Sequence, residues 1–225
     1  MKLENKELII FDFDGTLIDS APDLSDSINY MLEKLEKNTY SEKIIRTWVG
    51  NGASVLIKRA LCGDILVDDN KFDNELFEKA SKYFFEYYSK NFANKTTLYN
   101  NVENTLKYLY EKGYKLAIAT NKPDEYIKPI LDRFNLTHYF SIYIGANSVE
   151  KKKPHPMMLL KICNDLDILV ENSVMVGDSK NDILAAEKSN IDSIAVGYGY
   201  NYDEDISIYN PTISIEEFKS IEEFL

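Results

Sequence analysis

The chain has 225 residues, enough for one large domain or a core with a smaller appended domain, and enough to form a hydrophobic core without disulfides or a structural metal. Its 26 Lys and Arg residues against 37 Asp and Glu residues give a formal charge of −11, which argues against nucleic acid or an anionic membrane as a partner. Two distant cysteines, Cys62 and Cys163, and a sequence without a recognisable signal peptide or membrane span predict a cytoplasmic protein.

The first predicted element is a strand at residues 8–11, a continuous apolar run of the kind that is buried in a parallel sheet. Two carboxylates, Asp12 and Asp14, follow this run directly, and Gly15 comes next. A buried charge without a partner is strongly destabilising. The sequence therefore predicts that a cation neutralises these carboxylates.

Residues 20–92 are predicted to form an inserted all-helical domain, because they show helical spacing and no convincing strand. Ser20 and Asp23 resemble a capping box at the start of its first helix. Two short helices are predicted within residues 41–61, and a long helix is predicted within residues 74–92. We interpret the aromatic residues of the long helix as packing residues and not as a cofactor site.

The remainder of the chain predicts the core of an α/β protein. Apolar runs typical of strands alternate with segments of helical spacing, which is the pattern of a parallel sheet with helices on its faces. The predicted fold is therefore a Rossmann-like parallel sheet core, residues 1–19 and 93–225, with helices on both faces and an inserted all-helical domain. The predicted strands of this part are residues 115–120, 140–145, 173–178 and 192–197, and the predicted helices lie within residues 101–113, 124–134, 157–166 and 181–189.

Polar clusters follow four of the predicted strands. Asp12 and Asp14 follow the first strand, and Thr120 and Asn121 follow the second. The segment "KKKPHP" comes after the third, and "GDSKND" comes at the end of the fourth. In open α/β sheets, ligands bind beyond the carboxyl ends of the strands. We therefore expect these clusters to meet in one site.

The residue types in these clusters suit phosphate chemistry with a divalent cation. Asp12, Asp14 and Asp178 supply the oxygen ligands that Mg²⁺ prefers. Lys153 offers a positive charge to a phosphoryl oxygen and a neighbouring carboxylate, and the two lysines before it are alternatives. A carboxylate can attack phosphorus, and a second carboxylic acid can protonate the leaving oxygen and then activate water.

Further positions are predicted to support the same anion. Thr120 and Asn121 offer a hydroxyl and an amide to a phosphoryl oxygen. Gly15 lets backbone N–H groups approach a phosphate closely. Lys122 and Ser20 either help to line the site or cap helices, and for both residues the structural role is favoured.

The segment "DFDGTLIDS" resembles the first motif of the haloacid dehalogenase superfamily of phosphohydrolases. Thr120, Lys153 and "GDSKND" resemble its second, third and fourth motifs, in the family order. The resemblance implies that Asp12 is a nucleophile forming an aspartyl-phosphate and that Asp14 is the general acid and base. It also implies that the inserted domain, residues 20–92, is a cap over the site.

The same resemblance implies a Mg²⁺ site formed by the Asp12 side chain, the Asp14 backbone carbonyl and the Asp178 side chain. Asp182 would lie behind this site, where it would orient Lys153 or a water on the metal. The resemblance thus gives each acid of the first and fourth motifs a separate task.

Longer stretches resemble the phosphoglycolate phosphatase branch of this superfamily, namely "DSAPDL", "WVGNGA", "ATNKP", "KKPHP", "VGDSKNDILAA" and "GYGYN". The expected partner is a small phosphomonoester, with 2-phosphoglycolate as the favoured substrate. Backbone amides from Phe13 to Gly15 would help to seat its phosphate. Asn51 and Arg59 of the cap would meet its carboxylate, and a role for Arg59 in stabilising the cap is left open. Phe13 stands where this branch usually has Leu, which is a change in packing.

Other functions stay open at this stage. A sugar-phosphate mutase, a pyrophosphatase or a nucleotidase would use the same motifs, and a more distant alternative is a non-catalytic binding protein with this fold. A serine esterase built on Ser179 is disfavoured, because neither His138 nor His155 lies in a suitable motif. The chain is expected to be a monomer or a weak homodimer and to bind neither nucleic acid nor membranes.

Overall fold

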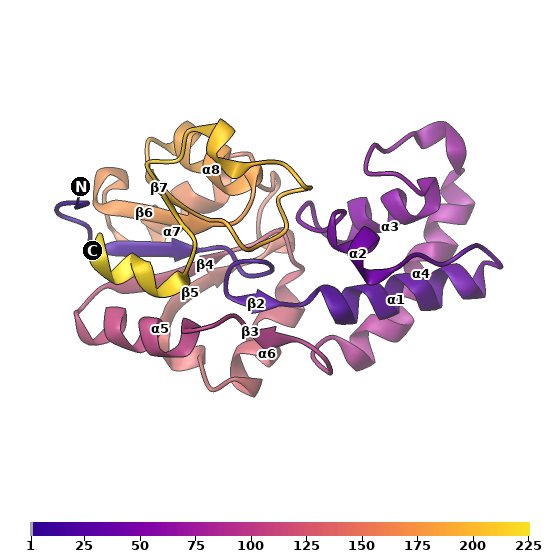
Figure 1. Cartoon of the computed structure of the whole chain (residues 1–225), viewed down its shortest axis with the longest axis horizontal. Helices are drawn as coiled ribbons and strands as arrows, with labels where there is room; N and C mark the ends of the chain where they lie inside the picture. Colours follow the sequence, from indigo (N-terminus) through magenta and orange to yellow (C-terminus); the bar gives the residue numbers. More distant parts are fainter. Residues whose placement is uncertain (1) are drawn as a thin grey trace.

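The computed structural model describes residues 2–225 and consists of an α/β core and a helical cap that lies beside it (Figure 1). A six-stranded sheet forms the centre of the core, with strand order β5-β4-β1-β6-β7-β8 and every neighbouring pair parallel. This sheet confirms the predicted fold class. Its strands are β1 (Leu8–Phe11), β4 (Lys115–Ala119), β5 (Phe140–Ile144), β6 (Ser173–Gly177), β7 (Asp192–Val196) and β8 (Ile213–Ile215).

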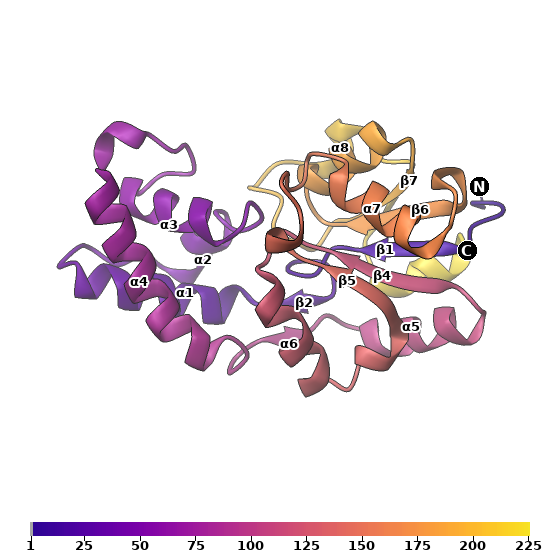
Figure 2. The ribbon, with the colours of Figure 1, turned by 180° about the vertical axis from the view of Figure 1, so that it is seen from behind.

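Strand β1 lies in the middle of the sheet, between β4 and β6 (Figure 2). Its side chains alternate between two buried faces, with Ile9 and Phe11 on one and Leu8 and Ile10 on the other. Full burial of one such side chain stabilises the fold by about 1.5–3 kcal/mol, so the residues that follow β1 extend from a rigid support. Helices α5 (Val102–Glu111) and α6 (Ile127–Arg133) cover the first face, and α7 (Met157–Leu166) and α8 (Lys180–Ser189) cover the second.

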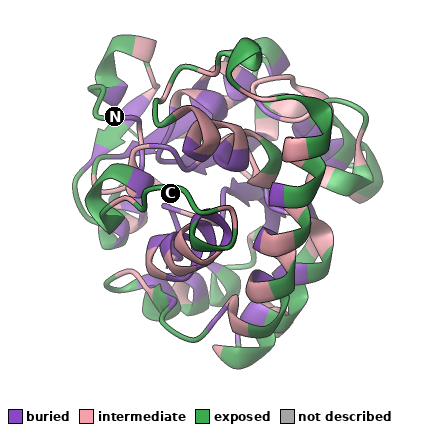
Figure 3. Ribbon diagram, turned by 90° about the vertical axis from the view of Figure 1, so that its right-hand side faces the viewer, coloured by how far each residue is buried: buried purple, intermediate pink, exposed green. Residues whose placement is uncertain are grey.

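The cap contains four α-helices and the short 3₁₀ helix Asp69–Lys71. Its two longest helices, α1 and α4, pack against each other. Buried and exposed residues alternate along α4, whereas α1 is buried or half-buried except for Glu33 and Lys34 at its end. Figure 3 shows buried residues toward the interior of the molecule and exposed residues at its periphery. Phe84 and Tyr88 of α4 are buried and stack with a ring-centroid distance of 5.3 Å. The cap helices are α1 (Ala21–Lys34), α2 (Glu42–Arg46), α3 (Ala53–Cys62) and α4 (Asn74–Asn91).

Two short antiparallel strands carry the chain into and out of the cap, β2 (Ile18–Asp19) and β3 (Thr97–Leu98). Next to them, the predicted capping box at Ser20 and Asp23 is wrong. The buried Asp23 carboxylate accepts hydrogen bonds from the backbone N–H groups of residues 95 and 96 and from the hydroxyl of Thr96. Asp23 therefore ties the start of the cap to its end.

Strand β8 is absent from the sequence-based prediction, because a three-residue run directly after a Pro-Thr pair gives too little periodicity. It nevertheless extends the sheet by pairing with β7. No helix formed by residues 2–225 has the length and apolar character needed to cross a membrane. Short 3₁₀ helices lie at Asp69–Lys71, Asp124–Tyr126, Thr137–Tyr139, Ala146–Ser148, Val170–Asn172, Ile206–Tyr209 and Phe218–Glu223.

Candidate active site

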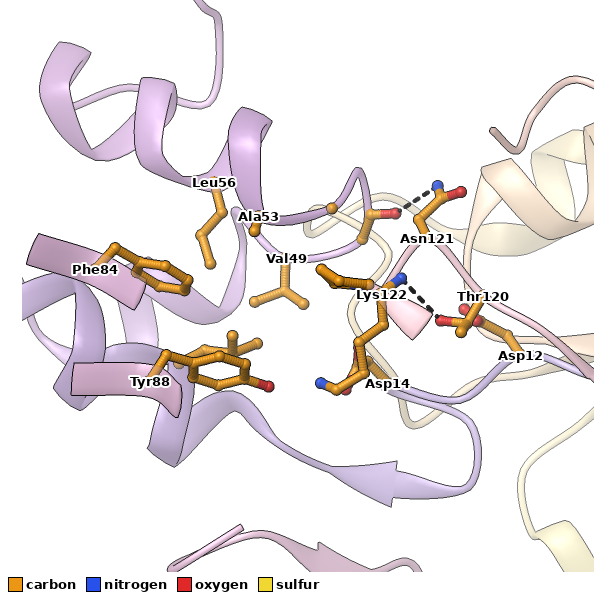
Figure 4. Close-up of a pocket in the computed structure, with 14 residues that line it drawn as sticks. Asp12, Asp14, Val49, Ala53, Leu56, Phe84, Tyr88, Thr120, Asn121 and Lys122 are labelled. Atoms are coloured by element: carbon orange, nitrogen blue, oxygen red, sulfur yellow. Dashed lines mark hydrogen bonds and ion pairs between the residues drawn. The ribbon is translucent and has the colours of Figure 1, made fainter. Parts of the chain in front are cut away.

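The carboxyl ends of β1, β4 and β6 point toward the cap, and the four predicted polar clusters meet there. Figure 4 shows two of these clusters, Asp12 with Asp14 and Thr120 with Asn121. Lys153 is at the centre of this arrangement. Its buried ammonium lies 2.9 Å from Oδ1 of Asp12 and 2.6 Å from Oδ1 of Asp182. Lys153 is thus the lysine of the triple-lysine segment that reaches the carboxylates.

The Asp182 carboxylate positions the Lys153 ammonium and the start of α8. Its Oδ2 accepts hydrogen bonds from the backbone N–H and the hydroxyl of Ser179, at 3.0 and 2.9 Å, at the start of α8. Its Oδ1 accepts from Lys153. Because both oxygens are in use, Asp182 orients Lys153, and the Ser179 hydroxyl serves the helix start and not a serine-esterase site.

Asp178 follows β6 and is held in place by two donors that the sequence analysis does not single out. Its Oδ1 accepts a hydrogen bond from the Thr16 hydroxyl at 2.7 Å, and its Oδ2 accepts one from the backbone N–H of Tyr200 at 2.6 Å. Gly15 has a φ of +94°, and a side chain there would collide with the Asp178 carboxylate. Glycine is therefore required at position 15 by this close approach as well as by its backbone conformation.

Asp14 forms a second buried ion pair. Its Oδ1 accepts hydrogen bonds from the Ser20 hydroxyl at 2.6 Å and from the Lys122 ammonium at 2.8 Å. The contacts of Ser20 and Lys122 agree with the site-lining role that the sequence also allows, and the favoured helix-capping role is wrong. The contact between Lys122 and Asp14 joins residues 108 positions apart, so no local sequence pattern reveals it.

The side chains of Thr120 and Asn121 make different contacts in the structure. The Thr120 hydroxyl accepts the backbone N–H of Lys122 at 3.2 Å and lines the cavity below the cap. The Asn121 side chain bonds both to the backbone N–H and to the carbonyl of Lys153, each at 3.0 Å, and to the carbonyl of Gly50 at 3.1 Å. These contacts brace the Lys153 backbone, and phosphate binding by Asn121 stays a prediction.

The predicted backbone donors near β1 have acceptors within the chain. The N–H of Phe13 donates to Oδ1 of Asp12 at 2.7 Å, and the N–H of Gly15 donates to the carbonyl of Ile18 at 2.8 Å. The Phe13 side chain is buried in the hydrophobic core. Phosphate binding by Phe13 and Gly15 therefore stays a prediction.

The cap loop is docked on the core. Oδ1 of Asn51 accepts a hydrogen bond from Tyr202 at 2.8 Å, and its amide donates to Asn181 at 3.3 Å. Arg59 donates to the carbonyls of Trp48 and Ile65 at 2.7 and 2.9 Å. The contacts of Arg59 favour the cap-stabilising role that the sequence analysis left open, and a contact of Asn51 with substrate stays a prediction.

A cavity of about 40 Å³ lies between the cap and the carboxylates. This is room for about three or four waters. Its cap-side wall is mostly apolar, so the cap shields the site from bulk water. The lining residues are Asp12, Asp14, Thr120, Asn121, Lys122 and Pro123 from the core and Leu24, Val49, Gly50, Gly52, Ala53, Leu56, Phe84 and Tyr88 from the cap.

Burial perturbs the ionisation of this site. Desolvation raises the pKa of Asp12 to about 7, against the opposing effect of Lys153. Desolvation, followed by the charges of Asp12 and Asp182, holds the pKa of Asp178 well above its usual range. Burial alone would lower the pKa of Lys153, but its two carboxylate partners raise it. The Lys153 ammonium therefore stays charged. The carboxylates of Asp12 and Asp178, by contrast, lack enough neighbouring positive charge to balance their own negative charge.

This imbalance fits a divalent cation. One oxygen from each of Asp12, Asp178 and Asp182 lies within 4.8 Å of the others. Together with Asp14 there are four carboxylates, and the ammonium groups that contact them are those of Lys122 and Lys153, which leaves two negative charges. An all-oxygen, doubly negative donor set suits a hard cation of charge +2.

Comparisons with known proteins agree with this site. The family model for haloacid dehalogenase-like hydrolases matches residues 9–196. The chain is 45% identical over 221 residues to a phosphoglycolate phosphatase of Psychrobacter arcticus, covering 98% of this chain and 96% of that one. It is 44% identical to a phosphoglycolate phosphatase of Colwellia psychrerythraea, covering 98% and 97%.

A structural neighbour gives the same result. A crystal structure of a predicted phosphoglycolate phosphatase from Haemophilus somnus superposes with a TM-score of 0.92 at 36% identity, covering 98% of each chain. The sequence motifs, the parallel sheet, the geometry of the site and these matches all indicate the same family. The chain belongs to the haloacid dehalogenase-like hydrolase family.

Proposed function

We propose that the protein is a Mg²⁺-dependent phosphatase that hydrolyses a small phosphomonoester, 2-phosphoglycolate, through an aspartyl-phosphate on Asp12. The observation that supports this most strongly is the convergence of Asp12 and Asp178 with the buried Lys153 ammonium, which contacts Asp12 directly. The names of the full-length relatives support the choice of substrate.

Asp12 acts as the nucleophile. The Lys153 ammonium and the N–H of Phe13 fix the orientation of its carboxylate, so that it faces the cavity. Attack on phosphorus forms an acyl-phosphate and releases the ester oxygen. Orientation of this kind lowers the entropic part of the barrier.

Asp14 acts as the general acid and then the general base. It lines the same cavity and is held by Ser20 and Lys122, which keep its carboxylate beside the path of the leaving oxygen. Asp14 protonates that oxygen in the first step. In the second step it removes a proton from the water that cleaves the acyl-phosphate.

Mg²⁺ would be held by the side chains of Asp12 and Asp178 and by the backbone carbonyl of Asp14. When bound, it supplies positive charge that offsets the charge of the transferred phosphoryl group. Lys153 and the Thr120 hydroxyl stabilise the phosphoryl oxygens from the protein side. Opening of the cap would admit the substrate, and its closure would exclude bulk water from the cavity.

An assay of released phosphate tests this function. Purified protein is incubated with 2-phosphoglycolate and a panel of other phosphomonoesters, with Mg²⁺ or with excess chelator. We expect Mg²⁺-dependent release of free phosphate, fastest from 2-phosphoglycolate. A mutase would convert a sugar phosphate without releasing phosphate, and a binding protein would leave every ester intact.

We further infer that the protein is cytoplasmic and acts as a monomer or a weak homodimer. Free thiols at Cys62 and Cys163 support a reducing compartment. Cell fractionation and sedimentation over a range of protein concentrations test the two inferences. A stable higher oligomer or a membrane-bound fraction would contradict them.

A further inference from the structure

One positively charged side chain, that of Lys122, lines the cavity between the carboxylates and the cap, as far as residues 2–225 are concerned. The Lys122 side chain is only 2% exposed, and its ammonium lies 2.8 Å from Oδ1 of Asp14. The cavity therefore contains an ammonium group that is paired with Asp14.

This ammonium has unused hydrogen-bonding capacity. An ammonium carries three N–H donors, and among residues 2–225 that of Lys122 forms one hydrogen bond, to Asp14. The buried hydroxyl of Tyr88 faces this ammonium (Figure 4), and no atom of residues 2–225 meets the geometry of a hydrogen bond to it. The Lys122 ammonium lies 5.4 Å from the centroid of the Tyr88 ring. Since buried polar groups are nearly always satisfied, these unused donors indicate the place of an anionic ligand group.

Within residues 2–225, no side chain of the cap-side wall is charged. Leu24, Val49, Leu56 and Phe84 contribute apolar surface there. Arg59, the cap cation considered from the sequence, is bound to backbone carbonyls and lies over the Tyr202 ring at 5.1 Å. An anionic group that enters the cavity beside Asp14 therefore meets Lys122 and Tyr88.

We propose that Lys122 and Tyr88 bind the substrate carboxylate and thereby select phosphomonoesters that carry a carboxylate one carbon from the ester oxygen. This inference rests on the proposed function, in which Asp14 protonates the ester oxygen. In such an ester the carboxylate carbon is two bonds from that oxygen, so the group that recognises it must lie beside Asp14. The direct contact of Lys122 with Asp14 meets this requirement.

The loop after β4 fixes the spacing of the two ends of the substrate. Thr120, assigned to the phosphoryl group, and Lys122 are two residues apart, and the N–H of Lys122 donates to the Thr120 hydroxyl. Two residues span at most about 7 Å of extended chain. The loop therefore suits an ester in which the phosphate and the carboxylate are separated by a single carbon and the ester oxygen.

Steady-state kinetics with two esters test the proposal. 2-Phosphoglycolate carries the carboxylate, and ethyl phosphate has the same number of carbons without it. The variants are Lys122→Met, which removes the charge, and Tyr88→Phe, which deletes one oxygen and keeps the buried ring. Lys161→Met, whose ammonium pairs with Asp165 at 2.9 Å on an exposed surface, is the matched control.

We expect the preference of the wild-type protein for 2-phosphoglycolate, measured as the ratio of kcat/KM values, to fall at least about tenfold in Lys122→Met. In Tyr88→Phe the loss should be about three- to tenfold and should fall mainly on KM for 2-phosphoglycolate. Lys161→Met should keep the wild-type ratio.

Equal losses for both esters would overturn the proposal, because Lys122 would then act only through Asp14. Tyr88→Phe leaves Asp14 and its partners in place, so an unchanged ratio in that variant would also overturn it. If the wild-type protein releases phosphate from neither ester, the proposed function fails as well. If it hydrolyses both esters with no preference, the inference fails while the phosphatase function stands.

Discussion

The Lys153 ammonium lies 2.6 Å from Oδ1 of Asp182, and both side chains are almost completely shielded from solvent. The same ammonium reaches Asp12 at 2.9 Å. Asp182 thus holds the cation that faces the nucleophile, although it does not line the cavity itself.

Replacing Asp182 should damage both stability and activity. We expect Asp182→Asn to lower the free energy of unfolding by about 3 kcal/mol, because a buried charge loses its partner, and to reduce kcat by about 10- to 100-fold. Chemical denaturation and phosphate release measure the two effects. Glu204→Gln, which breaks an exposed ion pair with Lys180 at 3.0 Å, is the control and should cost less than 1 kcal/mol. Equal effects of the two variants would argue against the positioning role.

Asp178 should be required for the response to metal. In the wild-type protein, Mg²⁺ at about 100 times its dissociation constant should raise the melting temperature by about 5–10 °C. Asp178→Asn should abolish this shift and the activity, since a neutral amide replaces a ligand carboxylate. Thermal denaturation with Mg²⁺ or chelator measures it, with Asp132→Asn on the exposed surface as control. A full shift in Asp178→Asn would remove Asp178 from the metal site.

The stabilisation by Mg²⁺ should depend on pH. The pKa of Asp12 is raised from 3.8 to about 7, chiefly by burial, so the metal-free folded state binds a proton that the unfolded state has released. Its contribution to stability is therefore present below pH 4 and is lost as the pH rises toward 7. Mg²⁺ binds the carboxylate form and competes with this proton.

We therefore expect the Mg²⁺-induced rise in melting temperature to be small at pH 5 and to reach its full size above pH 7. Thermal denaturation at constant ionic strength across this range measures it. A rise of equal size at pH 5 and pH 8 would show that the metal does not displace a proton from the site.

Asp23 should stabilise the junction between the cap and the core. Its buried carboxylate accepts hydrogen bonds from the N–H groups of Lys95 and Thr96 and from the Thr96 hydroxyl. Asp23→Ala should lower the free energy of unfolding by about 2–4 kcal/mol, because these donors lose a charged acceptor. Asp26→Ala, which breaks a partly exposed ion pair with Lys95, should cost less than 1 kcal/mol. Denaturant titrations that give equal losses would contradict the assignment.

The fold can be predicted from the sequence because the patterns that indicate its strands and helices lie in neighbouring residues. Short apolar runs indicate the strands, for example at residues 8–11 and 173–178, and helical spacing indicates the helices between them. The polar clusters are recognisable because they directly follow strands. Strand β8 is too short to give such a signal, and it forms because β7 offers an open edge. The capping box failed because Asp23 bonds to the far end of the cap, about 70 residues away.

Only part of the candidate active site can be predicted from the sequence. Asp12, Asp14 and Asp178 can be recognised as site residues because a carboxylate that follows a buried strand destabilises the fold unless a cation neutralises it. The role of Lys122 and Ser20 as partners of Asp14 cannot be decided from the sequence, because their contact depends on how the loop after β4 approaches β1. Tyr88 was interpreted as packing, and its ring does pack, but its hydroxyl reaches the cavity wall.

The most direct test of the account is chemical trapping of the aspartyl-phosphate. Wild-type protein is mixed with Mg²⁺ and 2-phosphoglycolate, quenched during turnover and reduced with borohydride, and the peptide that contains Asp12 is analysed by mass spectrometry. We expect conversion of Asp12 to homoserine, dependent on substrate, with none at Asp14. Steady phosphate release without any such product at Asp12 would contradict it.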